Sequence, residues 1–255
     1  SIQALDQGCE FLLVFSEPDF SENNTFLLSD WFIHTPQDVV AANFRKTPEE
    51  ISPFPDKEKY IFPASVPGPI ADVVRPTPEG PVPAPFTLHM DTVPVIESEA
   101  GRVRIVDVNT FPAAKTISAA FVEIEPGGMR ELHWHPKAAE WQYYIQGQAR
   151  MGVFNSNGVA RTFDYRAGDV GVVPFVAGHY VQNTGDETLI FVEIFKYPEY
   201  SDISARKWLA ANPAQIVADH LNVTTEFVES LPLEEQPAPV VWYDPSKATS
   251  TQRDS

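Results

Sequence analysis

Short runs of apolar residues follow one another through the middle of the chain, from residue 102 to residue 197. Examples are ISAAFVEI, EWQYYIQG, ARMGVF, GDVGVVP and TLIFVEIF, and Gly, Asn and Asp residues separate them. Each run has the length of one strand, and many short strands with turn residues between them are typical of an antiparallel sandwich or barrel. The pattern therefore predicts an all-β fold for this part of the chain.

Two further segments carry helical signals, and they resemble each other. WFIHTPQDVVAANF begins at Trp31 and WLAANPAQIVADHL begins at Trp208, and both fit the frame W-x4-P-x2-[VI]-V-A-x2-[FL]. Each follows a predicted strand, EFLLVF in the first case and IFVEIF in the second. Repeats of this kind indicate an internal duplication. We expect one copy to be complete at about 86–222 and only the last third of another to stand at 1–50.

The beginnings of the predicted helices carry local signals. Thr35 is placed to cap a helix that has Pro36 at its first position, which is a favourable position for proline. In TPEEI, Thr47 and Glu50 have the spacing of a capping box.

The duplication suggests a domain organisation. Aligned on the second copy, Ser1 corresponds to Tyr180, so we expect the first copy to continue upstream of this sequence. Residues 1–50 are then its remnant, and 51–95 are a proline-rich linker that is too broken for regular structure. A complete second domain follows at 96–222, and residues 223–255 form a C-terminal tail.

Composition limits the partners of this protein. The 255 residues carry a formal net charge of -17, which argues against nucleic acid or an anionic membrane as a partner. The longest apolar runs have about five residues, far short of the roughly 20 that span a membrane. One cysteine, Cys9, allows no intrachain disulfide. The sequons at Asn23 and Asn222 do not decide the compartment, for which a secreted or periplasmic location is slightly favoured.

Three histidines and a glutamate form the candidate metal set. His133 and His135 are two residues apart, so on a strand both imidazoles leave the same face. A turn after Pro136 brings Glu140 back toward them, and His179 follows in a later strand. This mixed nitrogen and oxygen set suits a divalent metal such as Mn, Fe, Zn or Ni, with open positions for a substrate.

Strand alternation alone does not assign Glu193 and Arg130 to the face that carries this set. If the turn NTGDET is a three-residue hairpin loop, His179 lies directly opposite Glu193 and both share a face; a two-residue turn moves Glu193 to the other face. In an apolar lining the pKa of Glu193 is expected to be raised, which suits proton transfer. Arg130 lies three residues before His133, so strict alternation places it on the opposite face.

The motif frame resembles the cupin superfamily. The first cupin motif, G-x5-H-x-H-x4-E-x6-G, is met in full, and the second is met with one mild departure, Gly178 immediately before the histidine. The segments MRELHWHP, PFVAGHYVQN and EIFKYPEY resemble the bicupin oxalate decarboxylases in particular. The resemblance implies a double-stranded β-helix, the cupin or jelly-roll barrel, with flanking short helices, in a bicupin whose second barrel is complete. The residues that meet the two motifs are Gly127, His133, His135, Glu140 and Gly147, and Gly168, Pro174, His179 and Asn183.

This resemblance also implies an activity. Bicupins of this branch convert oxalate to formate and carbon dioxide with Mn(II), and dioxygen acts as a co-catalyst. One Mn(II) site is expected in this chain, and a second in the missing first cupin. The expected partner is the small dianion oxalate, and a homo-oligomer, trimer or hexamer, is expected by family. Whether the fragment alone is active stays open.

Roles for individual residues follow from the same resemblance. His133, His135, Glu140 and His179 match the metal ligands, and Glu193 matches a residue beside the second metal. Arg130 matches the group that binds and polarises the substrate carboxylate, and Tyr200 matches a tyrosine associated with the site. In the first copy, Glu22 lies in SENN, close to the SENS type of lid that marks decarboxylases.

Two other functions remain open at this stage. Closely related bicupins are oxalate oxidases, which make carbon dioxide and hydrogen peroxide, and their lids lack the glutamate. A storage or sugar-binding bicupin is a non-enzymatic alternative, although such proteins usually lose metal ligands.

Overall fold

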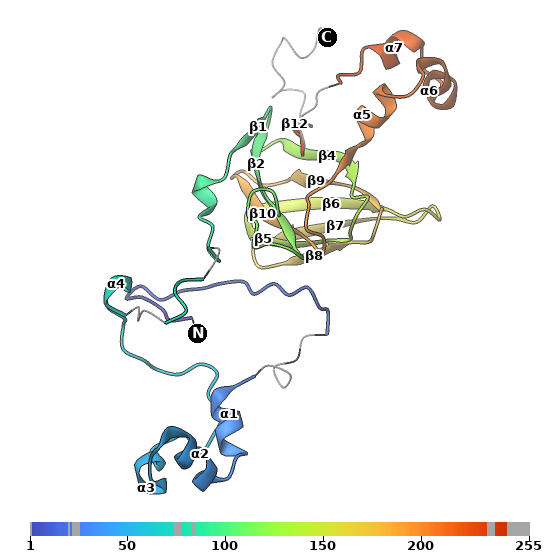
Figure 1. The fold of residues 1–255 in the computed structure, drawn as a ribbon. Helices are drawn as coiled ribbons and strands as arrows, with labels where there is room; N and C mark the ends of the chain where they lie inside the picture. Colours follow the sequence, from blue (N-terminus) through green and yellow to red (C-terminus); the bar gives the residue numbers. More distant parts are fainter. Residues whose placement is uncertain are drawn as a thin grey trace. The chain divides into compact units, whose positions relative to one another are not determined.

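The computed structural model describes residues 2–19, 21, 26–73, 78–82, 85–233 and 238–243. The chain divides into two compact units, residues 1–81 and residues 82–255, and each is described here by itself (Figure 1). The division falls inside the stretch 51–95 that the sequence indicates as a linker. Among the described residues, no helix has the length and apolar character needed to cross a bilayer.

The first unit contains short helices. Thr47 caps α3 through the predicted capping box, because its hydroxyl accepts from the Glu50 amide and the Glu50 carboxylate accepts from the Thr47 amide. The predicted cap at Thr35 was wrong. Pro36 is the N-cap of α2, and the Thr35 hydroxyl instead donates to the carbonyl of Trp31, one turn earlier. The helices are α1 (Leu28–Ile33), α2 (Gln37–Phe44), α3 (Pro48–Ile51) and α4 (Ile70–Val73).

EFLLVF does not form the strand that its sequence predicts. Residues 10–15 have no regular structure, and their apolar side chains are 40–56% exposed. The corresponding segment of the second copy is a strand between two others. Within its described residues, the first unit has no strand with which residues 10–15 could pair, and an isolated strand leaves its backbone groups unpaired.

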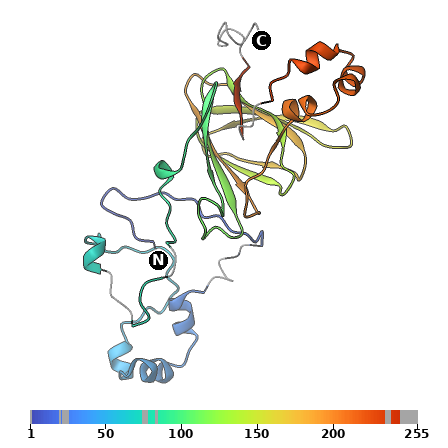
Figure 2. The ribbon, with the colours of Figure 1, turned by 45° about the horizontal axis from the view of Figure 1, so that its top comes forward.

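The second unit is built from two antiparallel sheets that face each other (Figures 1 and 2). One sheet has the strand order β1-β2-β3-β10-β5-β8, and the other has the order β11-β4-β9-β6-β7, with β12 also paired to β4. This agrees with the predicted all-β fold with short flanking helices. The strands are β1 (Ile96–Ser98), β2 (Gly101–Val106), β3 (Ser118–Ile124), β4 (Gly128–Trp134), β5 (Glu140–Gln146), β6 (Gln148–Phe154), β7 (Ala160–Arg166), β8 (Val170–Val173), β9 (Gly178–Asn183), β10 (Leu189–Phe195), β11 (Ile203–Ser204) and β12 (Val240–Trp242).

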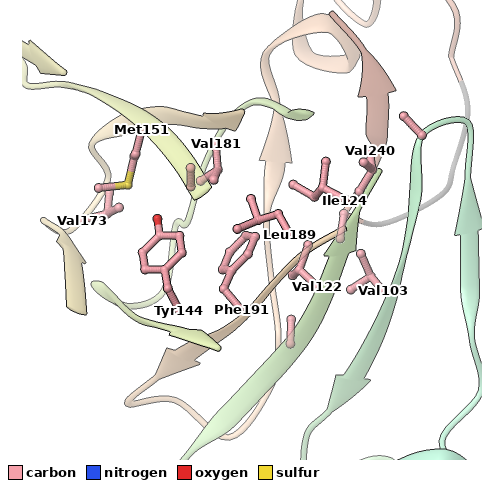
Figure 3. Close-up of a cluster of buried hydrophobic side chains, with 14 of the residues drawn as sticks. Val103, Val122, Ile124, Tyr144, Met151, Val173, Val181, Leu189, Phe191 and Val240 are labelled. Atoms are coloured by element: carbon pink, nitrogen blue, oxygen red, sulfur yellow. The ribbon is translucent and has the colours of Figure 1, made fainter. Parts of the chain in front are cut away.

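Apolar side chains from both sheets fill the interior (Figure 3). Tyr144 stacks on Tyr165 and on Phe191, with ring centroids 4.6 and 5.4 Å apart. Val181 comes from the opposite sheet and Val240 from the last strand. Burial of each such side chain contributes roughly 1.5–3 kcal/mol, so this core is the main stabilising element of the barrel.

The predicted pairing of His179 with Glu193 was wrong, because β9 and β10 do not form a hairpin. β9 belongs to one sheet and β10 to the other, and the segment between them crosses from sheet to sheet. Asn183 holds this crossing: its side chain donates to the carbonyls of Ile124 and Glu187 and accepts from the Gly185 amide. Both functional side chains are nevertheless buried, since each points inward from its own sheet.

The second unit extends beyond the predicted boundary at residue 222. A short 3₁₀ helix, η2 (Met90–Thr92), precedes the barrel, and the helices α5 (Ala205–Ala210), α6 (Ala214–Leu221) and α7 (Thr225–Glu229) follow it. From the predicted tail, α7 packs against α6 and β12 pairs with β4. The predicted boundary rests on the repeat frame, which ends at Leu221, and takes no account of the run VVWY at 240–243, whose β-branched and aromatic residues favour a strand.

The internal duplication appears again in the geometry of the helices. α2 and α6 both begin after proline and both end at a residue in the left-handed region, Arg45 and Asn222, each with φ of 55°. The small apolar cluster of each helical segment has the same spacing, with one difference in residue type at its last position. The clusters are Val40, Ala41 and Ile51 in one and Val217, Ala218 and Val228 in the other.

Candidate metal centre

The second unit brings the four predicted ligands together. His133 lies near the end of β4, His135 directly after it, Glu140 at the start of β5 and His179 in β9. One ligand atom from each of the four lies within 4.8 Å of the others, and all four residues are buried. The cluster therefore joins both sheets at one end of the barrel interior.

Backbone carbonyls orient all three imidazoles. The Nδ1 atoms of His133, His135 and His179 lie 2.6, 2.9 and 3.1 Å from the carbonyl oxygens of Glu131, Ser201 and Ala177. A carbonyl only accepts hydrogen bonds, so each Nδ1 carries the proton and each Nε2 presents a lone pair. Such outer hydrogen bonds are the usual way in which proteins orient histidine ligands.

The atoms that face one another across the cluster are buried without hydrogen-bond partners in the described structure. They are the three Nε2 atoms and Oε2 of Glu140. This oxygen lies 3.0 Å from Nε2 of His135 and 2.7 Å from Nε2 of His179. Buried polar atoms are rarely left unpaired, and a carboxylate oxygen facing imidazole lone pairs is unfavourable by itself. A divalent cation satisfies all four at once, so the residues fit a metal site.

Charge states in the cluster favour ligation. Burial, together with the positive charge of Arg130, lowers the pKa of His133 well below its ordinary value, which keeps this imidazole neutral. Burial opposes ionisation of Glu140, but His179 and His135 outweigh it, so the pKa of Glu140 is lowered and the carboxylate is ionised. Burial lowers the pKa of His135, but Glu140 outweighs it and raises this pKa, so a metal would compete with a proton there. Neutral imidazoles and an ionised carboxylate are the forms that bind a metal.

A hydrogen-bonded chain along β5 fixes Glu140. The Gln142 amide donates to Oε1 of Glu140, and the Tyr144 hydroxyl donates to Oε1 of Gln142, both at 2.6 Å. All three side chains are buried, because alternate residues of a strand share a face. Sequence reasoning missed Gln142 and Tyr144, although the pattern E-x-Q-x-Y contains the signal.

Arg130 lies inside the barrel, contrary to strict alternation. The pairing of β4 with β9 shifts between Arg130 and His133, which is a β-bulge. The bulge inserts one residue, so the side chain three positions before His133 returns to the inner face. Arg130 is fully buried, and its guanidinium donates to the Tyr200 hydroxyl at 3.1 Å and to the Asp202 carboxylate.

Glu193 is a second buried carboxyl beside the cluster. Burial and the negative charge of Glu140 raise its pKa, while Arg130 and His135 act in the opposite direction with smaller effect. Its Oε1 atom lies 3.8 Å from Nε of Arg130, and the Tyr200 hydroxyl lies 3.4 Å from Oε2. The site therefore holds a carboxyl group whose proton is available near neutral pH.

The structure places every predicted site residue of the second copy in one cluster. Glu22, the remaining predicted site residue, lies outside the described residues. Asp202 was missed because it meets Arg130 across 72 positions of sequence, which no local pattern indicates. The last strand was also missed, although the run VVWY at 240–243 favours a strand.

Comparison with known proteins agrees with this geometry. The sequence profile of the cupin family matches residues 90–229, which is more than half of the chain. The chain belongs to the cupin family. The barrel of two antiparallel sheets is thus the cupin barrel that the motifs imply, and the four residues of the cluster are those of the two cupin motifs.

Similar cupins include named oxalate decarboxylases. The chain is 55% identical to the oxalate decarboxylase OxdC of Bacillus subtilis over 237 residues, which is 93% of this chain and 62% of that protein. A crystal structure of the Lactobacillus farciminis oxalate decarboxylase in complex with formate is 62% identical, with a TM-score of 0.82, over 85% of this chain and 64% of that one.

A third comparison concerns a metal. A structure of the Bacillus subtilis oxalate decarboxylase, determined in a study of its Mn(II) centres, is 54% identical, with a TM-score of 0.83, over 88% of this chain and 59% of that one. This chain thus spans less than two thirds of the length of the relatives that it matches.

Proposed function

We propose that this chain is part of a manganese-dependent oxalate decarboxylase, which converts oxalate to formate and carbon dioxide. The observation that carries the proposal is the pair of Arg130 and Glu193 beside three imidazoles and a carboxylate, all buried. Arg130 is a cation that can bind a substrate carboxylate, and Glu193 beside it is a carboxyl group that can exchange a proton. Identities of 54–62% to named oxalate decarboxylases support the same function.

His133, His135, Glu140 and His179 would hold the metal. The relative's Mn(II) centres favour manganese, and the donor set of imidazole and carboxylate suits it. When bound, manganese supplies positive charge for a dianionic substrate and a redox-active centre. Local positive charge matters here, because the protein carries a formal net charge of -17 and oxalate approaches against that field.

Arg130 would bind one carboxylate of oxalate. Arginine pairs with carboxylates through its planar fork of N–H donors, and the interaction is strong where water is excluded. Nε of Arg130 is buried and has no hydrogen-bond partner among the described residues, so it has a donor to offer.

Glu193 would move the proton. In the overall reaction the C–C bond of hydrogen oxalate breaks, one carboxyl carbon leaves as carbon dioxide, and the other carbon keeps the electron pair and takes up a proton to become formate. A carboxyl group with a raised pKa exchanges protons with little cost near the working pH. Tyr200, which contacts both Arg130 and Glu193, would hold their relative orientation.

The lid glutamate of the first copy, Glu22, would protonate the carbon centre at the other metal site. This role rests on the resemblance of SENN to decarboxylase lids, since Glu22 lies outside the described residues. An oxidase would lack this proton donor and would release peroxide.

A product assay tests the proposal. The full-length protein and this chain are each loaded with Mn(II), supplied with oxalate and air, and assayed for bound metal, formate and hydrogen peroxide. We expect bound manganese in both and formate without stoichiometric peroxide from the full-length protein. Peroxide without formate would identify an oxidase, and absence of both products with no bound metal would identify a storage protein.

A further inference from the structure

The Arg130 guanidinium is held on one side and free on the other. Nη2 donates to Tyr200 and to Asp202, and Nη1 donates to the carbonyl of Pro239 at 3.3 Å. Nε has no hydrogen-bond partner in the described structure and lies toward Glu193, 3.8 Å from its Oε1. The described residues therefore accept hydrogen bonds from both Nη atoms and none from the Nε edge.

One of the contacts on the Nη side, the Pro239 carbonyl, comes from residues near the end of the described chain. Residues 238–243, here called the terminal strap, include β12, which pairs with β4 so that Val240 lies opposite Arg130. Ala238 is fully buried, and its amide donates to the same Asp202 oxygen that receives the arginine, at 3.2 Å. Asp202 thus joins the strap to the guanidinium.

The backbone of the strap is held in an unfavourable conformation. Ala238 has φ of 51°, in the left-handed region that non-glycine residues seldom adopt. Such a conformation persists where neighbouring contacts determine it. The contacts that determine it here include the hydrogen bond to Asp202 and the pairing of β12 with β4.

Asp202 also balances the positive charge of Arg130. Its side chain is 8% exposed and that of Arg130 is fully buried, so the two form an ion pair nearly without water. A buried arginine that loses its partner is strongly disfavoured. Glu193 is the other carboxyl group near the guanidinium, but its atoms make no hydrogen bond to it, which leaves Asp202 as its hydrogen-bonded anion among the described residues.

We propose that Asp202 and the terminal strap position Arg130, fixing its Nη side so that its Nε edge faces the bound oxalate. The proposal rests on the proposed function, because it assumes that oxalate binds beside Arg130. Asp202 acts here through Arg130 and is a positioning residue. The strap then links the C-terminal segment of the chain to substrate affinity.

Oxalate binding to the manganese-loaded full chain, measured by calorimetry without oxygen, is the first test. Asp202→Asn keeps the shape of the side chain and removes its charge. We expect its Kd for oxalate to rise tenfold or more while bound manganese per chain stays unchanged. Glu199→Gln removes a nearby exposed carboxylate, which pairs with Lys137, and is expected to leave the Kd unchanged.

A double-mutant cycle separates positioning from general damage. If Asp202 acts through Arg130, Asp202→Asn in an Arg130→Lys background should change the Kd by less than twofold, because the group it positions is already gone. A Kd within twofold of wild type for Asp202→Asn alone would overturn the proposal. An equal loss in both backgrounds would also overturn it.

A third measurement needs neither metal nor oxalate. In the metal-free protein, Asp202→Asn should speed hydrogen exchange at the Ala238 amide and merge the separate Nη1 and Nη2 signals of Arg130 in a nitrogen-15 NMR spectrum. Unchanged exchange and unchanged signals would contradict the positioning role. If the wild-type protein binds no oxalate, the proposed function fails, while this measurement still decides whether Asp202 and the strap hold Arg130.

Discussion

Nε of Arg130 lies 3.8 Å from Oε1 of Glu193, and both side chains are completely buried. They reach this distance from opposite sheets, Arg130 from the bulge in β4 and Glu193 from β10. The pair combines a permanent cation with a carboxyl group whose pKa is raised by burial and by Glu140. The predictions below follow from this arrangement and from the barrel that holds it.

Glu193→Gln should lower proton-transfer activity at this centre with little effect on folding. Glutamine keeps the size of the side chain and removes the exchangeable carboxyl proton, and loss of a general acid or base typically costs 10²–10⁴-fold in rate. We expect formate release attributable to this site to fall by at least about 10²-fold. Formate is measured with bound manganese as the control; a variant with normal metal and normal rate would exclude Glu193 from the reaction.

Glu22→Ala should shift the product ratio of the full-length protein. Removal of the lid carboxyl group takes away a proton donor, so decarboxylation should fall and any oxidase side reaction should rise. Formate and hydrogen peroxide are measured in the same reaction, with Glu17→Ala as a control upstream of the lid. An unchanged ratio would remove Glu22 from its assigned role.

Manganese should stabilise the folded protein. A metal that binds the folded state alone raises stability in proportion to the logarithm of its concentration over Kd, by about 2.7 kcal/mol at 100 times Kd. We expect a higher Tm with manganese than with a chelator, and no such rise for His179→Ala, which removes one imidazole of the cluster. A rise of equal size in His179→Ala would place the stabilising ion elsewhere.

Acid should weaken an ion pair on β2 and β3. Arg102 hydrogen-bonds to Glu123 and lowers its pKa below the ordinary value of 4.5, although partial burial opposes this. Because the pKa of Glu123 is lower in the folded than in the unfolded protein, its ionised carboxylate stabilises the folded state at pH values above the unfolded pKa. This contribution is lost as the pH falls through the folded pKa. The free energy of unfolding should therefore be lower for Glu123→Gln at pH 7, by up to about 1 kcal/mol.

As the pH falls below 4.5 and through the lowered folded pKa of Glu123, the difference between Glu123→Gln and wild type should shrink toward zero. Denaturant unfolding of both proteins at several pH values checks this, and a difference that grows toward acid would have the wrong sign.

Phe191→Ala should strongly destabilise the barrel. The ring is fully buried against Tyr144, and truncation of a buried phenylalanine costs about 3–5 kcal/mol through lost burial and a remaining cavity. Phe154 also lies on a strand but is 54% exposed, so Phe154→Ala is the matched control, with an expected loss under about 1 kcal/mol. Denaturant unfolding distinguishes the two; equal losses would contradict the placement of the core.

Local patterns were sufficient for much of the site. His133, His135 and Glu140 are close in sequence, so strand alternation and one short turn are enough to place them together. The duplication was also readable, because both copies keep the frame W-x4-P-x2-[VI]-V-A-x2-[FL] in one continuous stretch. Local helix signals were readable where the bonded groups lie within one turn. Thr47 and its capping box are an example.

Predictions of longer-range contacts were wrong where they depended on which strands pair with each other. The two apolar runs on either side of NTGDET were predicted to form a hairpin. Instead, the Asn183 side chain donates to the carbonyl of Ile124 in another strand, and the chain crosses to the opposite sheet. Residues 10–15 have strand-forming side chains, yet a strand also needs a neighbour, and the described part of the first unit has none.

The sequence by itself determined the all-β class, the ligand set and the repeated helices, because these depend on residue type and on spacing over a few residues. Only the tertiary structure decided that Arg130 faces the interior, that Glu193 lies beside it, and that Asp202 and the terminal strap hold it. A bulge reverses the face of one side chain, and a crossing between sheets joins residues far apart in sequence. Neither leaves a local pattern, because both arise from how the strands pair.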